Sequence, residues 1–209
     1  YWKIALSPED PELIEIRRGE SGIRAWAAEP GEYYHSFDGS YGGLWRRNGR
    51  PPQLLAGVGF SAQGKFEGSY YRRTAESRAP DLAWMFEGIE DQEILGDFGF
   101  SGGGAAGFEL DRADVRLGTP EEVRVVASSE NHTSSFVLVP EEMLTHITNW
   151  PGEEEQQKLI RSDIVYFRTP SGGEVFSTGS ITFCGSLPWN DFDNNISRLL
   201  ENVIRRFLQ

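Results

Sequence analysis

The sequence contains a single cysteine, Cys184, among 209 residues, so it cannot form an internal disulfide. A chain without disulfides fits a reducing compartment, and we therefore expect a cytoplasmic protein. The three histidines are too far apart for a zinc signature such as two histidines at helical spacing. No apolar run approaches the roughly 20 residues of a membrane span.

Basic residues are also scarce, because 20 Lys and Arg stand against 32 Asp and Glu and give a net charge of -12. A surface that binds nucleic-acid phosphates needs clustered Lys and Arg. The nearest such run, residues 46–50, is short and typical of a solvated turn, so we expect neither a nucleic acid nor a membrane as a partner. The hydrophobic fraction of 38% is sufficient for a packed core.

The clearest secondary structure lies at the end of the chain. Residues 163–169 and 174–177 flank a Pro-Ser-Gly-Gly turn and predict a β-hairpin, whose second strand we expect to continue through residues 180–183. Apolar residues then recur at helical spacing over 196–208, after an Asp-Asn-Asn sequence that offers N-cap chemistry. This pattern predicts a C-terminal helix.

Further strands are predicted at residues 122–127 and 135–139, which are rich in β-branched residues. Residues 12–18 fit either a strand or a helical turn. Strands together with a terminal docking helix indicate a layered α/β or α+β domain. We expect a mixed sheet, although the βαβ units that would establish a parallel part are mostly missing.

The most unusual segment is Ser101–Arg112, which contains Gly102, Gly103, Gly104 and Gly107. No Lys-Ser/Thr follows these glycines, so a phosphate loop is disfavoured. Glycines allow a backbone to approach another group closely, and we expect a ligand there with Glu109 beside it. A carboxylate in a glycine-lined, apolar wall of a ligand site can perform general acid–base catalysis. An ion pair between Glu109 and Arg112 is the structural alternative, with equal weight.

Two other residues carry possible chemistry. His132 follows a predicted strand, where side chains often line clefts, but a histidine with only local hydrogen bonds is the more common case. Cys184 lacks the flanking glycines of a nucleophile elbow. We expect it to be a buried, inert strand residue, because free cysteine is among the most buried residue types.

The motifs of this chain resemble one known family, the carboxy-terminal region of the large (beta) subunit of N,N-dimethylformamidase. The resemblance runs nearly end to end and is densest around Glu109 and at residues 185–197. The segments that carry it are Tyr1-Trp2, Trp26, Pro30–Tyr33, Gly102–Gly104, Glu109–Arg112, Leu117–Pro120, Ala127–Ser129 and Gly185–Asn195. The sequence departs from the family at Cys184, where the family has an apolar residue.

The resemblance implies a bacterial, cytoplasmic amide hydrolase with a catalytic domain similar to the class I glutamine-amidotransferase fold. Its enzymes hydrolyse dimethylformamide to dimethylamine and formate with a mononuclear iron held by two tyrosines and a glutamate. Those ligands would precede Tyr1, so no metal ligand is assigned within this chain. We therefore expect residues 1–209 to be the C-terminal part of one catalytic-type domain, with its N-terminal strands and metal-site segments missing.

The same resemblance assigns a catalytic role to Glu109, which matches an active-site glutamate of the family. Tyr1, Trp2, Gly107 and His132 are candidates for the substrate pocket. The expected partners are a small amide substrate and other subunits, either in a homo-oligomer or in a hetero-oligomer with a small companion subunit.

Two alternatives stay open at this stage. One is a non-catalytic, glutamine-amidotransferase-like binding domain, associated with carbohydrate. The other is an amidotransferase that uses Cys184 as its nucleophile.

Overall fold

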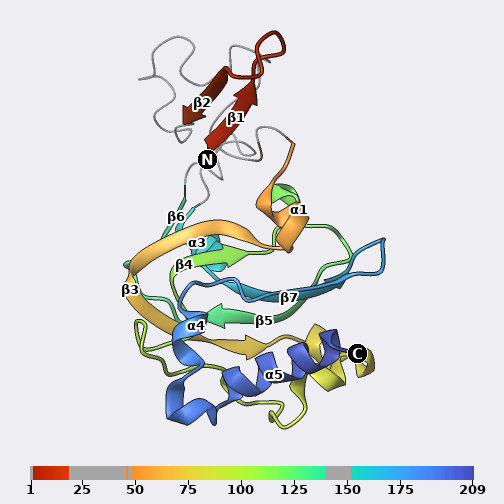
Figure 1. Ribbon diagram of the computed structural model, residues 1–209. Coiled ribbons are helices and arrows are strands. Elements are labelled where there is room, and N and C mark those ends of the chain that lie inside the picture. Colours follow the sequence, from red (N-terminus) through yellow and green to blue (C-terminus); the bar gives the residue numbers. More distant parts are fainter. Residues whose placement is uncertain (1, 19–45, 47–48, 140–151) are drawn as a thin grey trace.

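The computed structural model of the protein describes residues 2–18, 46, 49–139 and 152–209. Its centre is an antiparallel sheet in the order β4-β3-β5-β7-β8, with the short strand β6 also paired to β3. The long strand β3 pairs first with β4 and β6 and then with β5, so the sheet curls along it (Figure 1). The strands are β3 (Gly59–Arg73), β4 (Ala106–Arg112), β5 (Arg124–Glu130), β6 (Val137–Leu138), β7 (Asp163–Arg168) and β8 (Glu174–Ser177).

The sheet corrects one prediction, since every strand pair within the described residues is antiparallel and the mixed sheet is not found there. Antiparallel neighbours need only a turn or a loop between them, whereas parallel neighbours need a crossover, usually a helix. The predicted α/β composition with a C-terminal helix is confirmed. The glutamine-amidotransferase-like arrangement stays a prediction.

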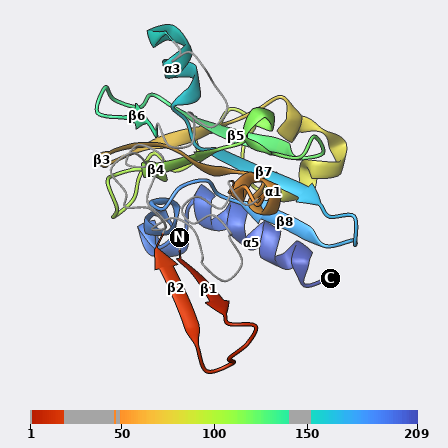
Figure 2. The same cartoon turned by 90° about the horizontal axis from the view of Figure 1, so that it is seen from above.

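Helices lie on both sides of this sheet. Figure 2 shows α5 on one side and α3 on the other. The α-helices are α1 (Pro52–Ala56), α3 (Glu153–Leu159), α4 (Phe183–Ser186) and α5 (Asn195–Phe207). The 3-10 helices are η3 (Glu76–Arg78), η4 (Pro80–Phe86), η5 (Val115–Leu117) and η6 (Trp189–Phe192).

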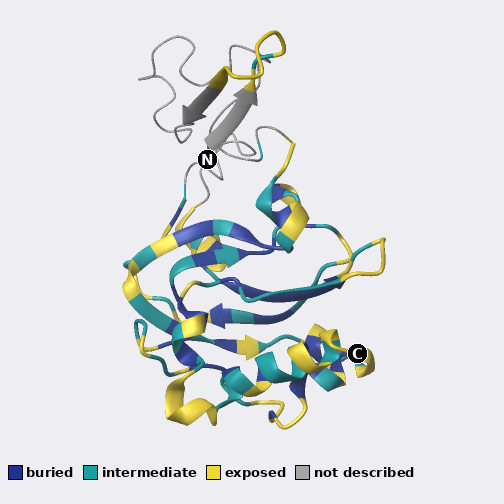
Figure 3. Ribbon diagram, viewed as in Figure 1, coloured by how far each residue is buried: buried dark blue, intermediate teal, exposed yellow. Residues whose placement is uncertain are grey.

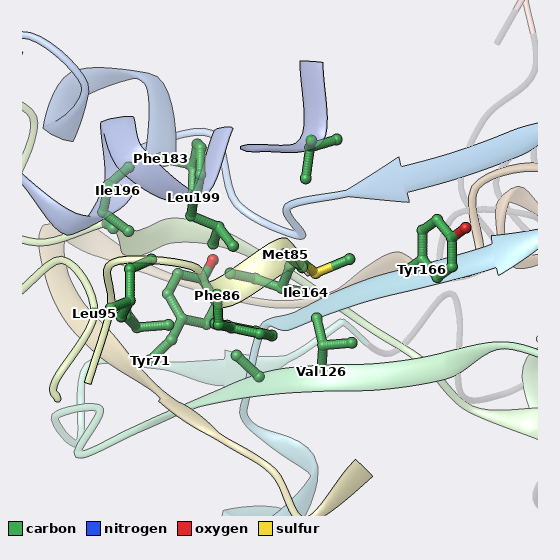
Figure 4. Packing of buried hydrophobic residues seen from close by; sticks show 14 of the residues in the cluster. Tyr71, Met85, Phe86, Leu95, Val126, Ile164, Tyr166, Phe183, Ile196 and Leu199 are labelled. Carbon is green, nitrogen blue, oxygen red and sulfur yellow. The ribbon is translucent and has the colours of Figure 1, made fainter. Parts of the chain in front are cut away.

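The larger hydrophobic cluster, here called the first core cluster, fills the space between α5, η4 and the sheet. Ile196 and Leu199 belong to it and extend from α5, and Tyr71 lies near Leu95 (Figure 4). Its buried members are Tyr71, Leu82, Met85, Phe86, Ile89, Leu95, Ala105, Ala106, Val126, Ala127, Ile164, Tyr166, Phe183, Ile196, Leu199 and Val203. A second core cluster is composed of Ala62, Leu110, Phe136, Leu138, Leu159 and Ile160. Dark blue segments in Figure 3 follow these buried residues along the strands.

The predicted C-terminal helix is confirmed as α5, and the side chain of Asn194 caps it by accepting a hydrogen bond from the Ser197 N–H. The buried residues of its apolar stripe are Ile196, Leu199 and Val203. The stripe becomes exposed towards the C-terminus, where Leu208 is 81% exposed.

The predicted hairpin is confirmed as β7 and β8, but the continuation of its second strand is wrong. The chain leaves β8 after Ser177 and forms an isolated bridge between Ser180 and Leu110. It then enters the short helix α4, because Phe183 inserts its ring into the first core cluster.

A separate hairpin precedes the main sheet. Strands β1 (Trp2–Leu6) and β2 (Ile14–Arg18) pair in antiparallel fashion, so residues 14–18 form a strand rather than a helical turn. Both views show this hairpin apart from the central sheet (Figures 1 and 2). Within the described residues, no helix has the length and apolarity that a membrane crossing requires.

Candidate active site

Glu109 lies in β4 opposite Gln63 of β3. Its neighbour Leu110 is fully buried in the second core cluster, so the alternation of the strand directs Glu109 to the opposite face. Gln63 and its other register partner Val137 are both exposed on that face. Within the described part of the chain, the half-buried Glu109 carboxylate has no hydrogen bond and no ion pair.

The residue before Glu109 sets this direction. Phe108 has a φ of 59°, in the left-handed region, which costs a non-glycine residue about 1 kcal/mol or more. Residues 64–67 of β3 stand opposite Phe108 in an irregular stretch of the register, and the rings of Phe66 and Phe108 meet edge to face at 5.6 Å. Bulges of this kind re-aim side chains.

The irregularity changes which core the strand faces. Ala106 belongs to the first core cluster and Leu110 to the second. In a regular strand these two residues, with Phe108 between them, would share one face. The left-handed Phe108 therefore reverses the alternation and keeps Glu109 out of the second core cluster.

The glycines before Glu109 allow a close approach, but at Gly104 and Gly107 the group approached is β3 rather than the expected ligand. A Cβ atom on Gly104 would lie 2.3 Å from the Ser69 carbonyl oxygen. On Gly107 it would lie 2.2 Å from the carbonyl oxygen of Glu67. Only glycine fits at these two positions. Gly103 has open space around it, since a Cβ atom there would meet no heavy atom within 4 Å.

Arg112 does not form the alternative ion pair with Glu109. Its fully buried guanidinium pairs with Asp114 at 3.0 Å and donates a hydrogen bond to the Leu159 carbonyl at 3.4 Å. Burial lowers the pKa of Arg112, and the Asp114 carboxylate opposes that effect. Glu109 is thus left without this partner.

His132 lies in the loop between β5 and β6, and its Nε2 is 2.6 Å from the Ser129 hydroxyl. That hydroxyl accepts the Ser162 N–H at 2.7 Å, so it can donate its own proton to Nε2. Burial lowers the pKa of His132 to about 4, although the charge of Glu67 opposes the shift. The Nδ1 atom is buried and has no hydrogen-bond partner among the described residues.

The structure does not join His132 to the other candidates by any hydrogen bond or ion pair among the described residues. Its ring packs against Phe136 of the second core cluster, with centroids 4.8 Å apart. Glu109 faces away from that cluster. A role for His132 in the substrate pocket remains a prediction.

The two candidates at the start of the chain are also untested. Tyr1 lies outside the described residues. Trp2 is the first residue of β1 and pairs with Arg18, but its side chain lies outside the described part of the structure. Cys184 is described, and here the sequence prediction is wrong: it lies in α4 and is exposed rather than buried in a strand.

Two residues near Glu109 were missed by the sequence analysis. Asp111 is two positions further along β4, a spacing that puts both carboxylates on one strand face and that could have been recognised. Ser180 bonds through its hydroxyl to both backbone groups of Gly107. No sequence signal links Ser180 to Gly107, because these residues are far apart in the chain.

A protein-held iron requires several donor side chains close together. Within the described ranges, no three or more His, Cys, Asp or Glu side chains are grouped so that they could hold a metal ion. A centre held by two tyrosines and one glutamate is a different donor set, so the implied iron stays a prediction.

Comparison with known proteins bears on the resemblance directly. The family described as "N,N-dimethylformamidase beta subunit-like, C-terminal" matches residues 1–195. The N,N-dimethylformamidase beta subunits of Alcaligenes sp and Paracoccus aminophilus are each 40% identical over 209 residues. The alignments cover 100% of this chain and 27% of each relative, so the chain spans about a quarter of their length. The chain therefore belongs to the family of N,N-dimethylformamidase beta subunit-like C-terminal regions.

Proposed function

We propose that this chain forms part of the active site of an amide hydrolase that cleaves small N-substituted amides of the dimethylformamide type. Its contribution is the carboxylate of Glu109. The observation that carries the proposal is the environment of this group, which has no hydrogen-bonding or ion-pairing partner within the described residues although it lies on a restrained strand.

Such a carboxylate can transfer a proton in both directions during amide hydrolysis. Glu109 would take a proton from the attacking water as the C–O bond forms. It would return that proton to the amine nitrogen as the C–N bond breaks, which leaves a carboxylic acid and a neutral amine. General acid–base catalysis of this kind contributes roughly 10²–10⁴-fold to a rate.

The remaining groups of the active site would come from outside the described residues. An iron held by parts of the intact protein outside the described residues would polarise the amide carbonyl or activate water. The relatives are named beta subunits, which supports an assembly with at least one other kind of chain.

The test is a Glu109→Gln variant of the intact protein, with dimethylamine release from dimethylformamide as the assay. We expect turnover to fall at least about 100-fold while the iron content, measured by inductively coupled plasma mass spectrometry, stays unchanged. Glu121→Gln is the matched control, because Glu121 is an exposed carboxylate in the turn before β5. Turnover of Glu109→Gln within a few-fold of the parent would refute the assigned role.

A further inference from the structure

Gly107 is held on two sides, two residues before Glu109. Its N–H donates to the Ser180 Oγ at 2.8 Å, and the Ser180 hydroxyl donates to the Gly107 carbonyl at 2.9 Å. On the other side, Gly107 lies against the backbone of Glu67 and Gly68 so closely that no side chain fits. The peptide groups of Gly107 therefore have little freedom to rotate.

The strand is fixed a second time just after Glu109. The Asp111 N–H donates to the Gly179 carbonyl at 2.7 Å, and Leu110 forms an antiparallel bridge with Ser180. Both attachments come from the same short segment, Thr178–Ser180, here called the strap. Glu109 thus lies between two points at which the strap holds β4.

The strap is itself anchored in the first core cluster. The buried Tyr71 donates its hydroxyl proton to the Thr178 carbonyl at 2.7 Å and lies 2.9 Å from the Ser162 hydroxyl. Burial raises the pKa of Tyr71, so its phenol stays protonated and remains a donor. Gly179 has a φ of 67° and would place a Cβ only 2.4 Å from the Asp163 carbonyl oxygen.

Phe108 connects these restraints to the direction of Glu109. Its left-handed φ of 59° is an unfavourable conformation that persists only when its surroundings impose it. The residue before it is fixed by Ser180, and the strand after it is fixed by Gly179. Loss of the Ser180 hydroxyl would remove the restraint on one side of Gly107 and would let Phe108 relax towards ordinary strand geometry, which would redirect Glu109.

We propose that Ser180 is a positioning residue for Glu109: its hydroxyl, bound to both backbone groups of Gly107, holds the strained Phe108 and thereby the direction of the Glu109 carboxylate. This inference rests on the proposed catalytic role of Glu109. Ser180 itself need not touch the substrate.

The test compares Ser180→Ala with Ser177→Ala in the intact protein. Ser177 is a matched control, because its hydroxyl donates to the Ala56 carbonyl at 2.6 Å, in contact with α1 rather than β4. For Ser180→Ala we expect kcat for dimethylformamide to fall about 10–100-fold with KM within about twofold, because a displaced catalytic group loses rate more than binding. Ser177→Ala should keep kcat within about twofold.

Two further measurements separate positioning from general stability. Ser180→Thr restores the hydroxyl and should recover most of kcat. Hydrogen exchange should accelerate at residues 106–112 in Ser180→Ala while α5 keeps its protection. Unchanged exchange in β4, an equal loss in Ser177→Ala, or a failure of Ser180→Thr to recover kcat would overturn the inference.

A double variant distinguishes this inference from the proposed function. If Ser180 acts through Glu109, adding Ser180→Ala to Glu109→Gln should cause no further loss of kcat. A further loss of 10-fold or more would show that Ser180 acts independently and would overturn the inference alone. An active Glu109→Gln would instead refute the proposed function.

Discussion

The environment of His132 predicts that this histidine stays neutral well into the acidic range. If Ser129 donates its proton to Nε2, the ring has no free acceptor site that water could protonate without breaking this hydrogen bond. In this tautomer the proton is on Nδ1, which is buried and has no acceptor among the described residues, so an imidazolium would keep that unsatisfied N–H and would also turn Nε2 into a donor facing the Ser129 hydroxyl. Burial accordingly lowers the pKa of His132 to about 4, against the opposing charge of Glu67.

The stability consequence follows from linkage. Above the ordinary pKa of 6.5 both the folded and the unfolded chain carry a neutral His132, and between 6.5 and about 4 only the unfolded chain is protonated. Stability should therefore fall as the pH drops through this window. At about 1.4 kcal/mol per pH unit, the full loss is at most about 3.5 kcal/mol, and access of water to the half-buried ring would reduce it.

Two measurements check this prediction. The exchange rate of the His132 Cε1–H with deuterium, followed by mass spectrometry as a function of pH, reports the pKa of this one residue in the intact protein. In urea unfolding, His132→Gln should lose less stability than the parent between pH 7 and pH 4. A measured pKa of 6 or above, or identical pH dependence for the two proteins, would refute the reasoning.

Two predictions concern backbone geometry and capping. Gly107→Ala should lower the unfolding free energy by at least about 3 kcal/mol in thermal or urea unfolding, since its Cβ would meet the Glu67 carbonyl oxygen. The control Gly103→Ala should lose only about 1 kcal/mol, because Gly103 has a φ of 83° but open space around it. Equal losses of stability in the two variants would contradict the packing argument. Asn194→Ala should cost about 1–2 kcal/mol and lower the melting temperature, because its side chain caps α5 at the Ser197 N–H. Asn194→Asp keeps that acceptor and should lose less; a loss as large as that of alanine would show that the amide donors matter more than the cap.

Local patterns predicted the C-terminal part of the fold well. The helical spacing of apolar residues in α5 and the turn residues between β7 and β8 are both local patterns of consecutive residues, and both predictions are confirmed. The strand predicted at residues 180–183 failed because its outcome depends on distant groups. Ser180 forms a bridge with Leu110, and Phe183 packs into the first core cluster, most of whose residues come earlier in the chain. No window of local sequence contains that information.

The candidate site shows the same division. The glycines near Glu109 indicated a close approach of backbone, but the group against Gly104 and Gly107 is β3 and not the ligand expected there, because the sequence around the glycines does not contain their distant neighbour. The prediction that Cys184 is buried in a strand was wrong for a related reason. The tendency of cysteine to be buried is an average over proteins, and α4 presents this one to the surface.

The irregular geometry of β4 next to Glu109 is informative about the role of this residue. A carboxylate that only faces solvent can sit on a regular strand, and it needs neither a left-handed residue before it nor a strap beside it. Here Phe108 is strained, Gly107 admits no side chain, and the Ser180 hydroxyl is committed to holding that glycine. Strain of this kind persists where the surrounding structure over-determines it, and it tends to gather at functional sites. The combination of a restrained backbone and a carboxylate without a partner among the described residues favours a catalytic role for Glu109 over a structural one.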